Sequence, residues 1–374
     1  SRNSTAYLSD GTLVNTNLPR FEQGKFGKAV MVEEGTTNLI TNPSFESDWT
    51  DWLKNDNAAA SYSILTGGQY SSKYCELKFI SNTTYSAYIY RDITGLAPNT
   101  TYTISFYGRW VFTQAVDYGV FVQRYDVGTF ANGRILWSSG GAVENSSPNW
   151  QRISFQYTTS ASETGIRLVL CLYAGPNDET GSYFHIDNIL FEQKPYATSF
   201  IDGTRAAETL TITTERVLNP REGTIEQWVY VNDIMKRQLG GSANCMLFNI
   251  PRYGNNSGIY LCHRGDSPSW EFRTSDDDGT YTTKRVSNSY TPNGWHLFSL
   301  RWTLNRVDLF IDGVLRGTID NPKLPSTFHS YAAFGSTMSS WYPINSLIDD
   351  LRISSIARSD KEILAAYQSD QPLP

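Results

Sequence analysis

Apolar and polar residues alternate along most of this chain. Residues 101–107, 150–157 and 306–312 change character at almost every step, so alternate side chains would share one face of a strand. Turn residues such as Pro98 and Asn99 separate these runs. Many short strands at regular spacing predict an all-β fold built from sandwiches or barrels.

One segment departs from this alternation and predicts a short helix at residues 360–368. Ser359 precedes the segment and Glu362 follows three positions later, which is the spacing of a capping box. We expect this C-terminal helix to cover the edge of a sandwich.

Length and composition narrow the classes of protein. A chain of 374 residues exceeds one average core and favours two domains. Charged residues make up 18% and aromatic residues 14%, a balance typical of extracellular β-proteins that bind through aromatic faces. The net charge of −6 argues against nucleic-acid partners. The sequence contains no run of 18 apolar residues, so we expect no membrane insertion.

The four cysteines lie far apart in the sequence and form no C-x-x-C pair. Cys75 and Cys171 fall inside strand-like runs, where buried free thiols are the favoured interpretation. Cys245 and Cys262 flank a hairpin turn at 251–258, so one disulfide between them stays open as an alternative.

The first half of the chain carries a series of motifs in a fixed order. They are TNLITNPSFE at 37–46, GLAPNTTYTISF at 95–106, WQRI at 150–153 and FHIDNILF at 184–191. This order resembles the carbohydrate-binding modules associated with cellulases and xylanases. The resemblance implies a β-jelly-roll of two sheets over residues 37–200.

The second half resembles the laminin-G-like, concanavalin-like sandwich. The residues that carry the resemblance are GTIEQWV at 223–229, GWHLF at 294–298, VDLFIDG at 307–313 and IDDLRI at 348–353. The resemblance implies a second β-sandwich over residues 201–374.

Residues 1–36 contain a segment at 24–33 that resembles the first strand of laminin-G-like domains. The pieces that follow it in that family come here only after residue 205. We therefore predict that the module at 37–200 is inserted into the second sandwich, and that residues 28–33 pair with the closing strand at 347–353. The alternative is that residues 1–36 form a linker or an extra strand of the first module.

The tandem of the two domains is similar to structural proteins of the tails and fibres of tailed bacteriophages and prophages. This resemblance implies host-surface recognition, with bacterial surface polysaccharide and other virion or tail proteins as partners. It implies a protein of the virion or the extracellular space, whose cysteines are reduced because such particles assemble in a reducing cytoplasm. Two alternatives stay open: a purely structural decoration of a virion or surface layer, and an accessory binding region of a secreted polysaccharide-degrading enzyme. A homo-oligomer is also open, although no heptad repeat enforces one.

In jelly-roll modules of the type that the first half resembles, a structural calcium ion often ties the first strand to the last. The matching oxygen-bearing residues here are Asn42, Glu46 and Asp187. Backbone carbonyls would supply the remaining oxygen ligands. The alternative is that these are surface carboxylates beside a turn.

Sugars stack on aromatic rings and hydrogen-bond to planar polar side chains. Side chains of both kinds fall on the non-core faces of the strands predicted around residues 101–110, 118–125 and 150–157. The candidate carbohydrate-binding residues are Tyr107, Arg109, Gln123, Tyr125, Trp150, Arg152 and Gln156. Alternatively, these residues belong to different sheets or lie under a neighbouring domain or subunit.

A second aromatic set could rim a lectin-like groove in the second domain. Its members are Tyr253, Tyr260, Trp270, Tyr281, Tyr290 and Trp341.

Nothing in the sequence predicts catalysis. Glucanases with sandwich folds need clustered carboxylates on one strand, and the strand at 223–231 has only Glu226. The chain also contains no G-x-S-x-G elbow and no phosphate-binding loop. We therefore expect a binding protein rather than an enzyme.

Overall fold

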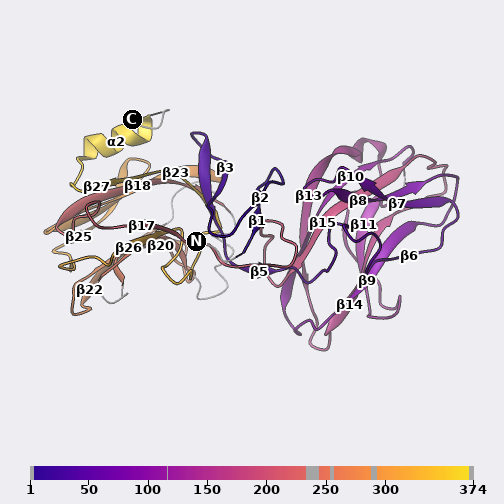
Figure 1. Ribbon diagram of the computed structural model, residues 1–374, viewed down its shortest axis with the longest axis horizontal. Helices are drawn as coiled ribbons and strands as arrows, with labels where there is room; N and C mark the ends of the chain where they lie inside the picture. The colour runs from indigo at the N-terminus through magenta and orange to yellow at the C-terminus, as the bar shows by residue number, and fades with distance from the viewer. Residues whose placement is uncertain (1–3, 116, 233–243, 253–256, 288–292, 370–374) are drawn as a thin grey trace. The chain divides into compact units, whose positions relative to one another are not determined.

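The computed structural model describes residues 4–115, 117–232, 244–252, 257–287 and 293–369. The chain divides into two compact units, which Figure 1 shows as two sets of strands. Unit 1 consists of Ser1–Leu8, Val14–Gly35 and Ala206–Pro374, and unit 2 consists of Ser9–Leu13 and Thr36–Arg205. Both units are built from antiparallel strands, and α2 (Asp360–Gln368) is a short C-terminal helix. The predicted all-β fold is confirmed.

Unit 2 is a sandwich of two five-stranded sheets. The sheet that we call the β10 sheet has the order β13 (Ser147–Thr158), β10 (Thr101–Val111), β15 (Tyr183–Glu192), β8 (Lys73–Phe79), β7 (Ala60–Thr66). The β14 sheet has the order β12 (Arg134–Ser138), β11 (Val120–Tyr125), β14 (Gly165–Leu172), β9 (Ala87–Thr94), β6 (Leu53–Lys54). A single 3-10 turn, η1 (Val143–Asn145), is described between β12 and β13.

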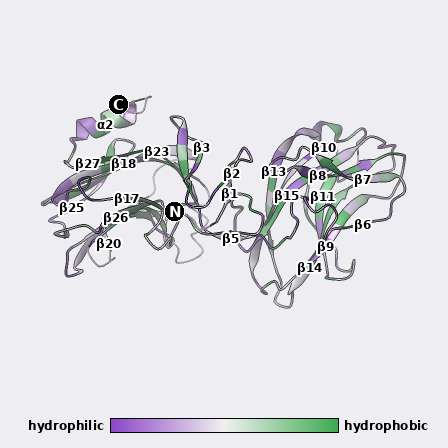
Figure 2. Ribbon diagram, viewed as in Figure 1, coloured by the Kyte–Doolittle hydropathy of each residue, from purple (hydrophilic) through white to green (hydrophobic). Residues whose placement is uncertain are grey.

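The alternation of the sequence determines which side chains fill the core of unit 2. In β10, Tyr102, Ile104 and Phe106 are buried in the core, whereas Tyr107 and Arg109 lie on the other face and are half-buried. Figure 2 shows hydrophobic and hydrophilic residues following one another along such strands. Each sheet of the sandwich therefore has an inner apolar face and an outer face of mixed character.

Unit 1 is a sandwich of a seven-stranded and a six-stranded sheet. The β18 sheet has the order β25 (Val314–Asp320), β24 (Arg306–Ile311), β23 (Gly294–Thr303), β18 (Glu222–Val231), β27 (Ser346–Ser354), β4 (Lys28–Val32), β3 (Arg20–Gln23). The β20 sheet has the order β17 (Leu210–Thr213), β26 (Tyr331–Phe334), β19 (Cys245–Pro251), β20 (Ser257–His263), β21 (Ser269–Ser275), β22 (Tyr281–Ser287). Two short ladders complete the strands: β1 (Ala6–Tyr7) with β2 (Leu13–Val14), and β5 (Thr36–Thr37) with β16 (Thr204–Arg205).

Strand β4 joins the seven-stranded sheet between β3 and β27. Val30 lies opposite Ile348, and Val32 lies opposite Ser346. This is the pairing that the insertion hypothesis requires of residues 28–33. The division into units falls after Gly35 and after Arg205, close to the boundaries that the sequence suggested.

The two ends of unit 2 run antiparallel to each other. Thr36 and Thr37 pair with Arg205 and Thr204 in the β5–β16 ladder. One residue further on, the Asn38 amide donates to the Gly203 carbonyl oxygen at 2.7 Å. Unit 2 therefore begins and ends at neighbouring points, as a domain inserted into a loop must.

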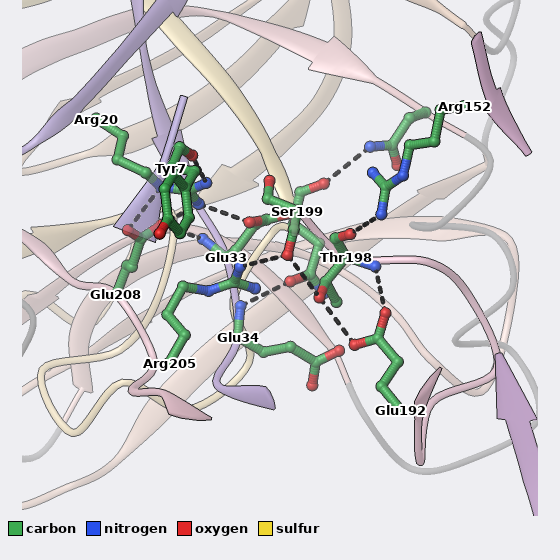
Figure 3. Close-up of polar contacts among 12 residues, drawn as sticks. Tyr7, Arg20, Glu33, Glu34, Arg152, Glu192, Thr198, Ser199, Arg205 and Glu208 are labelled. Carbon is green, nitrogen blue, oxygen red and sulfur yellow. Dashed lines mark hydrogen bonds and ion pairs between the residues drawn. The ribbon is translucent and has the colours of Figure 1, made fainter. Parts of the chain in front are cut away.

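A buried ion cluster in unit 1 lies at the residues that flank unit 2 in the sequence (Figure 3). Arg20 is fully buried and donates to both carboxylate oxygens of Glu208, at 2.9 and 2.7 Å, and to Glu33 at 2.6 Å. The amide of Glu33 also donates to Glu208 Oε2 at 3.0 Å, and the Glu208 amide donates to the Glu33 carbonyl oxygen at 2.9 Å. Burial opposes the charged guanidinium, but the two carboxylates outweigh it and raise the pKa of Arg20. Arg20 thus holds together the segments that precede and follow unit 2.

Helix α2 begins at the predicted capping box. Ser359 Oγ accepts from the Glu362 amide, and the Glu362 carboxylate accepts from the Ser359 amide at 2.8 Å. The helix lies over the outer face of the β18 sheet rather than over an edge, because Tyr367 stacks on Trp228 of the central strand β18 at 5.8 Å (Figure 1). A polar–apolar periodicity can place a helix on a sandwich but cannot tell a face from an edge.

All four cysteines are free and buried. Cys245 lies opposite His263, and Cys262 lies opposite Met246, so the two thiols point to different faces of the hairpin. Cys245 belongs to the core of unit 1, whereas Cys262 packs outside it. The disulfide that the sequence left open is therefore not formed. Across the described parts of the chain, we find no helix that is long and apolar enough to span a membrane.

Candidate functional site

The outer face of the β14 sheet carries a group of aromatic rings. Strand β9 contributes Tyr88 and Tyr90, because its alternate residues Ile89 and Ile93 face the core. Strands β11 and β14 and the loops beside them supply the rest. We call the following set the aromatic face: Tyr88, Tyr90, Phe121, Tyr125, Phe130 and Tyr173.

The rings pack edge-to-face. Phe130 is central: its ring centroid lies 5.9 Å from that of Tyr88, 5.2 Å from that of Tyr90 and 5.1 Å from that of Tyr125. Phe130 is 45% exposed, although it is a large apolar side chain. Edge-to-face packing holds the rings in place and leaves ring surface open to solvent.

Polar groups with planar ends accompany these rings. The Arg167 guanidinium lies over the rings of Tyr90 and Phe130, at 4.8 and 4.7 Å from their centroids. Arg167 is fixed there by a two-pronged contact to Asp92, at 2.8 and 3.0 Å. Tyr125 also packs against Phe130, and its hydroxyl donates to Gln123 Oε1 at 2.9 Å. The face therefore combines stacking surface with hydrogen-bonding groups in fixed positions.

Tyr88 and Tyr125 of this face are neutral hydrogen-bonding groups at ordinary pH. Burial raises the pKa of Tyr88 and of Tyr125 above the usual value, and the nearby Cys171 thiol adds to the shift. Their hydroxyls therefore stay protonated and can donate as well as accept hydrogen bonds.

An open hollow of about 590 Å³ adjoins the aromatic face at Tyr88. Its wall contains Asn55, Asp56, Asn57 and Tyr85, and Tyr85 is 75% exposed. The Asn55 side chain is fixed, because it accepts from the Tyr62 hydroxyl at 2.6 Å and from the Tyr88 amide at 2.8 Å. This volume lies in the usual range for small-ligand sites.

The seven carbohydrate-binding residues predicted from the sequence do not form one surface. Gln123 and Tyr125 lie on strand β11, in the β14 sheet. The other five lie on β10 and β13, on the outer face of the β10 sheet: Tyr107, Arg109, Trp150, Arg152 and Gln156. Alternation correctly assigned these side chains to outer faces, but the two sheets turn those faces in opposite directions.

Two of the five residues on the β10 sheet hold the chain that leaves it. Arg152 donates to the Thr198 carbonyl oxygen and to Ser105 Oγ, and Gln156 donates to the Pro195 carbonyl oxygen. Figure 3 includes the Arg152 contact beside the hydrogen bonds that join Thr198 to Glu192. Arg152 and Gln156 therefore fasten residues 194–198 of unit 2 to its sheet.

Sequence reasoning missed Tyr88, Tyr90, Phe130 and Arg167. A signal for the first two was present, since residues 87–92 read Ala-Tyr-Ile-Tyr-Arg-Asp and place both tyrosines on one face of a strand. Phe130 lies in the loop after β11, where no periodicity points to it.

The predicted calcium ligands each form hydrogen bonds with neighbouring groups. Asn42 donates to the carbonyl oxygens of residues 48 and 50, and its own oxygen accepts from the Ser47 amide. Glu46 accepts from the amides of residues 72 and 73, and Asp187 accepts from the Gln69 amide and the Ser71 hydroxyl. Within the described ranges, no group of three or more His, Cys, Asp or Glu side chains is placed to hold a metal ion. In this arrangement N–H and O–H donors of the loop at 67–73 serve both carboxylates, and the calcium site stays a prediction.

The aromatic set predicted for the second domain is dispersed. Trp270 is fully buried in the core of unit 1, and Tyr260 is buried with its hydroxyl on Glu271 at 2.7 Å. Tyr281 and Trp341 are exposed, at 54% and 67%. The remaining two residues of that set, Tyr253 and Tyr290, lie outside the described residues.

Comparisons with known proteins match each half of the chain to a family model. Residues 37–179 match a family model described as "Carbohydrate binding domain", and residues 202–364 match "Concanavalin A-like lectin/glucanases superfamily". No curated protein matches the chain.

Among solved structures, one match is the botulinum neurotoxin serotype G binding domain, with 14% identity and a TM-score of 0.36 over 43% of this chain. The match spans 40% of that domain. Another is the CBM40 of the Ruminococcus gnavus IT-sialidase, with 16% identity and a TM-score of 0.33 over 43% of this chain and 96% of that one. The chain therefore carries a carbohydrate-binding-module-like sandwich, matched over residues 37–179, followed by a concanavalin-like sandwich, matched over residues 202–364.

Proposed function

We propose that unit 2 binds a polysaccharide through the aromatic face of the β14 sheet. The observation that carries this proposal is the cluster of half-exposed rings around Phe130, flanked by Gln123 and the Arg167–Asp92 pair. The match to a carbohydrate-binding family over residues 37–179 supports it.

The chemistry of the face suits a sugar chain. C–H groups on one side of a sugar ring pack against aromatic carbon, while hydroxyl groups reach planar amide, carboxylate and guanidinium ends. Along β14, the residues from Arg167 to Tyr173 span roughly 20 Å at about 3.3 Å per residue. That length accommodates more than one sugar ring.

We propose binding without catalysis. Glycoside hydrolysis requires two carboxyl groups on either side of the scissile bond, about 5 to 9 Å apart. Beside the rings, Asp92 is already paired with Arg167. In unit 1, Glu226 is buried and bonded to Arg358. Neither carboxylate is placed as one of a catalytic pair.

The test is binding of unlabelled xylan, glucan and bacterial cell-wall glycans to the full chain, measured by calorimetry and by co-sedimentation. We expect Tyr90→Ala and Tyr125→Ala each to weaken binding by at least tenfold, because stacking surface is removed from either side of Phe130. Tyr331→Ala in unit 1 is the matched control, since Tyr331 is 46% exposed and lies in the other sandwich. Equal losses for all three variants, or unchanged binding in both unit 2 variants, would contradict the proposal.

We also propose that the protein is a non-catalytic recognition module of a bacteriophage tail or fibre, with bacterial surface polysaccharide as its ligand. The order of the two domains favours this setting. Four buried free thiols suit assembly in a reducing cytoplasm. Sedimentation of the labelled chain with intact bacterial cells tests this setting. Adsorption that the Tyr90→Ala variant loses supports host recognition, whereas glycan binding without adsorption to any bacterial strain favours an accessory region of a secreted enzyme.

A further inference from the structure

The outer face of the β10 sheet, on the opposite side of the unit 2 sandwich from the aromatic face, holds an arginine enclosed by rings. Arg109 projects from β10, and its guanidinium carbon lies 4.7 Å from the ring centroid of Trp150 and 5.2 Å from that of Tyr74. The two rings meet each other edge-to-face at 5.5 Å. We call the following set the Arg109 cluster: Tyr74, Glu76, Arg109, Trp150, Tyr183 and His185.

A hydrogen-bonded chain fixes the orientation of Arg109. Arg109 Nε donates to His185 Nδ1 at 2.8 Å, and His185 Nε2 lies 2.8 Å from Glu76 Oε2. Because Nδ1 accepts a hydrogen bond from a guanidinium, the imidazole is neutral and carries its proton on Nε2, which donates to Glu76. The Tyr183 ring stacks flat on His185 at 4.3 Å. Arg109 contributes only its Nε atom to this series of hydrogen bonds.

The outward end of the guanidinium has no acceptor. Within the described residues, neither Nη atom of Arg109 forms a hydrogen bond or an ion pair. The nearest carboxylate in the cluster, Glu76, is taken by His185. Lys78 shares the face of strand β8 with Glu76, so Arg109 and Lys78 are two cations beside the one carboxylate of the Arg109 cluster.

We propose that the Arg109 cluster is a second ligand site and that it binds the carboxylate of an acidic sugar residue. The two Nη groups of Arg109 form the fork that matches a carboxylate. Trp150 is half-buried beside that fork and offers aromatic surface to the body of the sugar. Packed against two rings and bonded at Nε, Arg109 is already in the binding orientation, so little side-chain entropy is lost on binding.

This site is distinct in place and chemistry from the aromatic face. The two lie on opposite outer faces of one sandwich, and they share no residue. On the aromatic face, Arg167 has its own carboxylate partner, Asp92, whereas Arg109 has none. The aromatic face thus suits neutral sugar rings, and the Arg109 cluster suits a uronate or another sugar acid.

The experiment is titration of the full chain with oligogalacturonate and, separately, with a neutral xylo-oligosaccharide, followed by calorimetry and tryptophan fluorescence at low salt. We expect Arg109→Gln to weaken oligogalacturonate binding by at least tenfold and to leave the neutral ligand unaffected. Arg316→Gln, at an exposed position of unit 1, removes the same charge and should change binding less than twofold. Arg109→Lys keeps the charge without the fork, so an intermediate loss is expected if the fork matters.

The outcomes separate this site from the proposed function. Tyr90→Ala should weaken binding of the neutral ligand by at least tenfold and spare oligogalacturonate. No binding of oligogalacturonate by the wild type overturns the second site. So does an equal effect of Arg109→Gln and Arg316→Gln, which would indicate attraction by overall charge. If Arg109→Gln alters the melting temperature of unit 2, the second site is judged instead from oligogalacturonate binding by the Arg109→Lys variant.

Discussion

Replacing Arg20 by Met tests how unit 1 is held together where the chain departs for unit 2. The substitution keeps an apolar stem of similar length but removes the donor of three short contacts, at 2.9 and 2.7 Å to Glu208 and 2.6 Å to Glu33. Both glutamates are 5% exposed, so two buried carboxylates would lose the guanidinium that they share.

Breaking a buried ion pair by removing one partner costs about 3 to 5 kcal/mol, because the uncompensated charge stays buried. For domains of 150 to 250 residues, 1 kcal/mol shifts the melting temperature by roughly 2 to 4 °C. We therefore expect the transition of unit 1 to fall by about 6 to 20 °C. The transition of unit 2 should not move, because none of the three residues belongs to it.

Differential scanning calorimetry of the full chain measures both transitions at once. Arg316→Met is the control, since Arg316 is an exposed arginine of the same unit and should shift the melting temperature by about 1 °C or less. Adding Glu33→Gln and Glu208→Gln to Arg20→Met removes the stranded charges and should recover part of the loss. A fall in unit 1 no larger than that of the control, or a triple variant less stable than the single one, would refute this reasoning.

Three further results are expected. Burial raises the pKa of Glu192, so the folded protein binds a proton at this carboxyl group more tightly than the unfolded chain does. The tighter proton binding stabilises the folded state at low pH, and this stabilisation is lost as the pH rises above about 4.5. Urea unfolding of unit 2 should therefore show the stability of Glu192→Gln rising relative to the wild type between pH 4 and 7, and a constant difference would contradict this. Gly223→Ala should destabilise unit 1 by about 1 to 3 kcal/mol in thermal melts, because its Cβ would lie 2.3 Å from the buried Trp302 ring; a neutral effect would mean that the ring can move. Because loop N–H and O–H groups already serve the predicted calcium ligands, a chelator should leave the melting temperature of unit 2 unchanged, and a fall of several degrees would instead support calcium.

The alternation of apolar and polar residues, together with the capping box, was sufficient to predict individual strands and the helix. Alternation at 150–157 predicted a strand that runs from Ser147 to Thr158, and the capping box fixed the start of α2 to the residue. These signals are local, because the face of a strand and the cap of a helix depend on side chains within a few positions.

The candidate site could be predicted only in part, because it depends on strand order. Gln123 and Arg109 both lie on outer faces, yet strand pairing assigns one to the β14 sheet and the other to the β10 sheet. Likewise, the turn between Cys245 and Cys262 was predicted, but a shift in register between Met246 and Phe248 was not, and register decides which side chains meet. Phe130 belongs to a loop, whose conformation follows from the rings that it packs against.

The pairing of β4 with β27 also determines when unit 1 can form during synthesis. Val30 must wait for Ile348, its partner in the ladder, which lies more than 300 positions later in the chain. At about 5 to 20 residues per second, that delay is roughly 15 to 60 s. Unit 2 is complete after Arg205, well before β27 emerges from the ribosome. Unit 2 therefore has time to fold first, and its paired ends then hold the segments of unit 1 before Thr36 and after Arg205 within reach of each other.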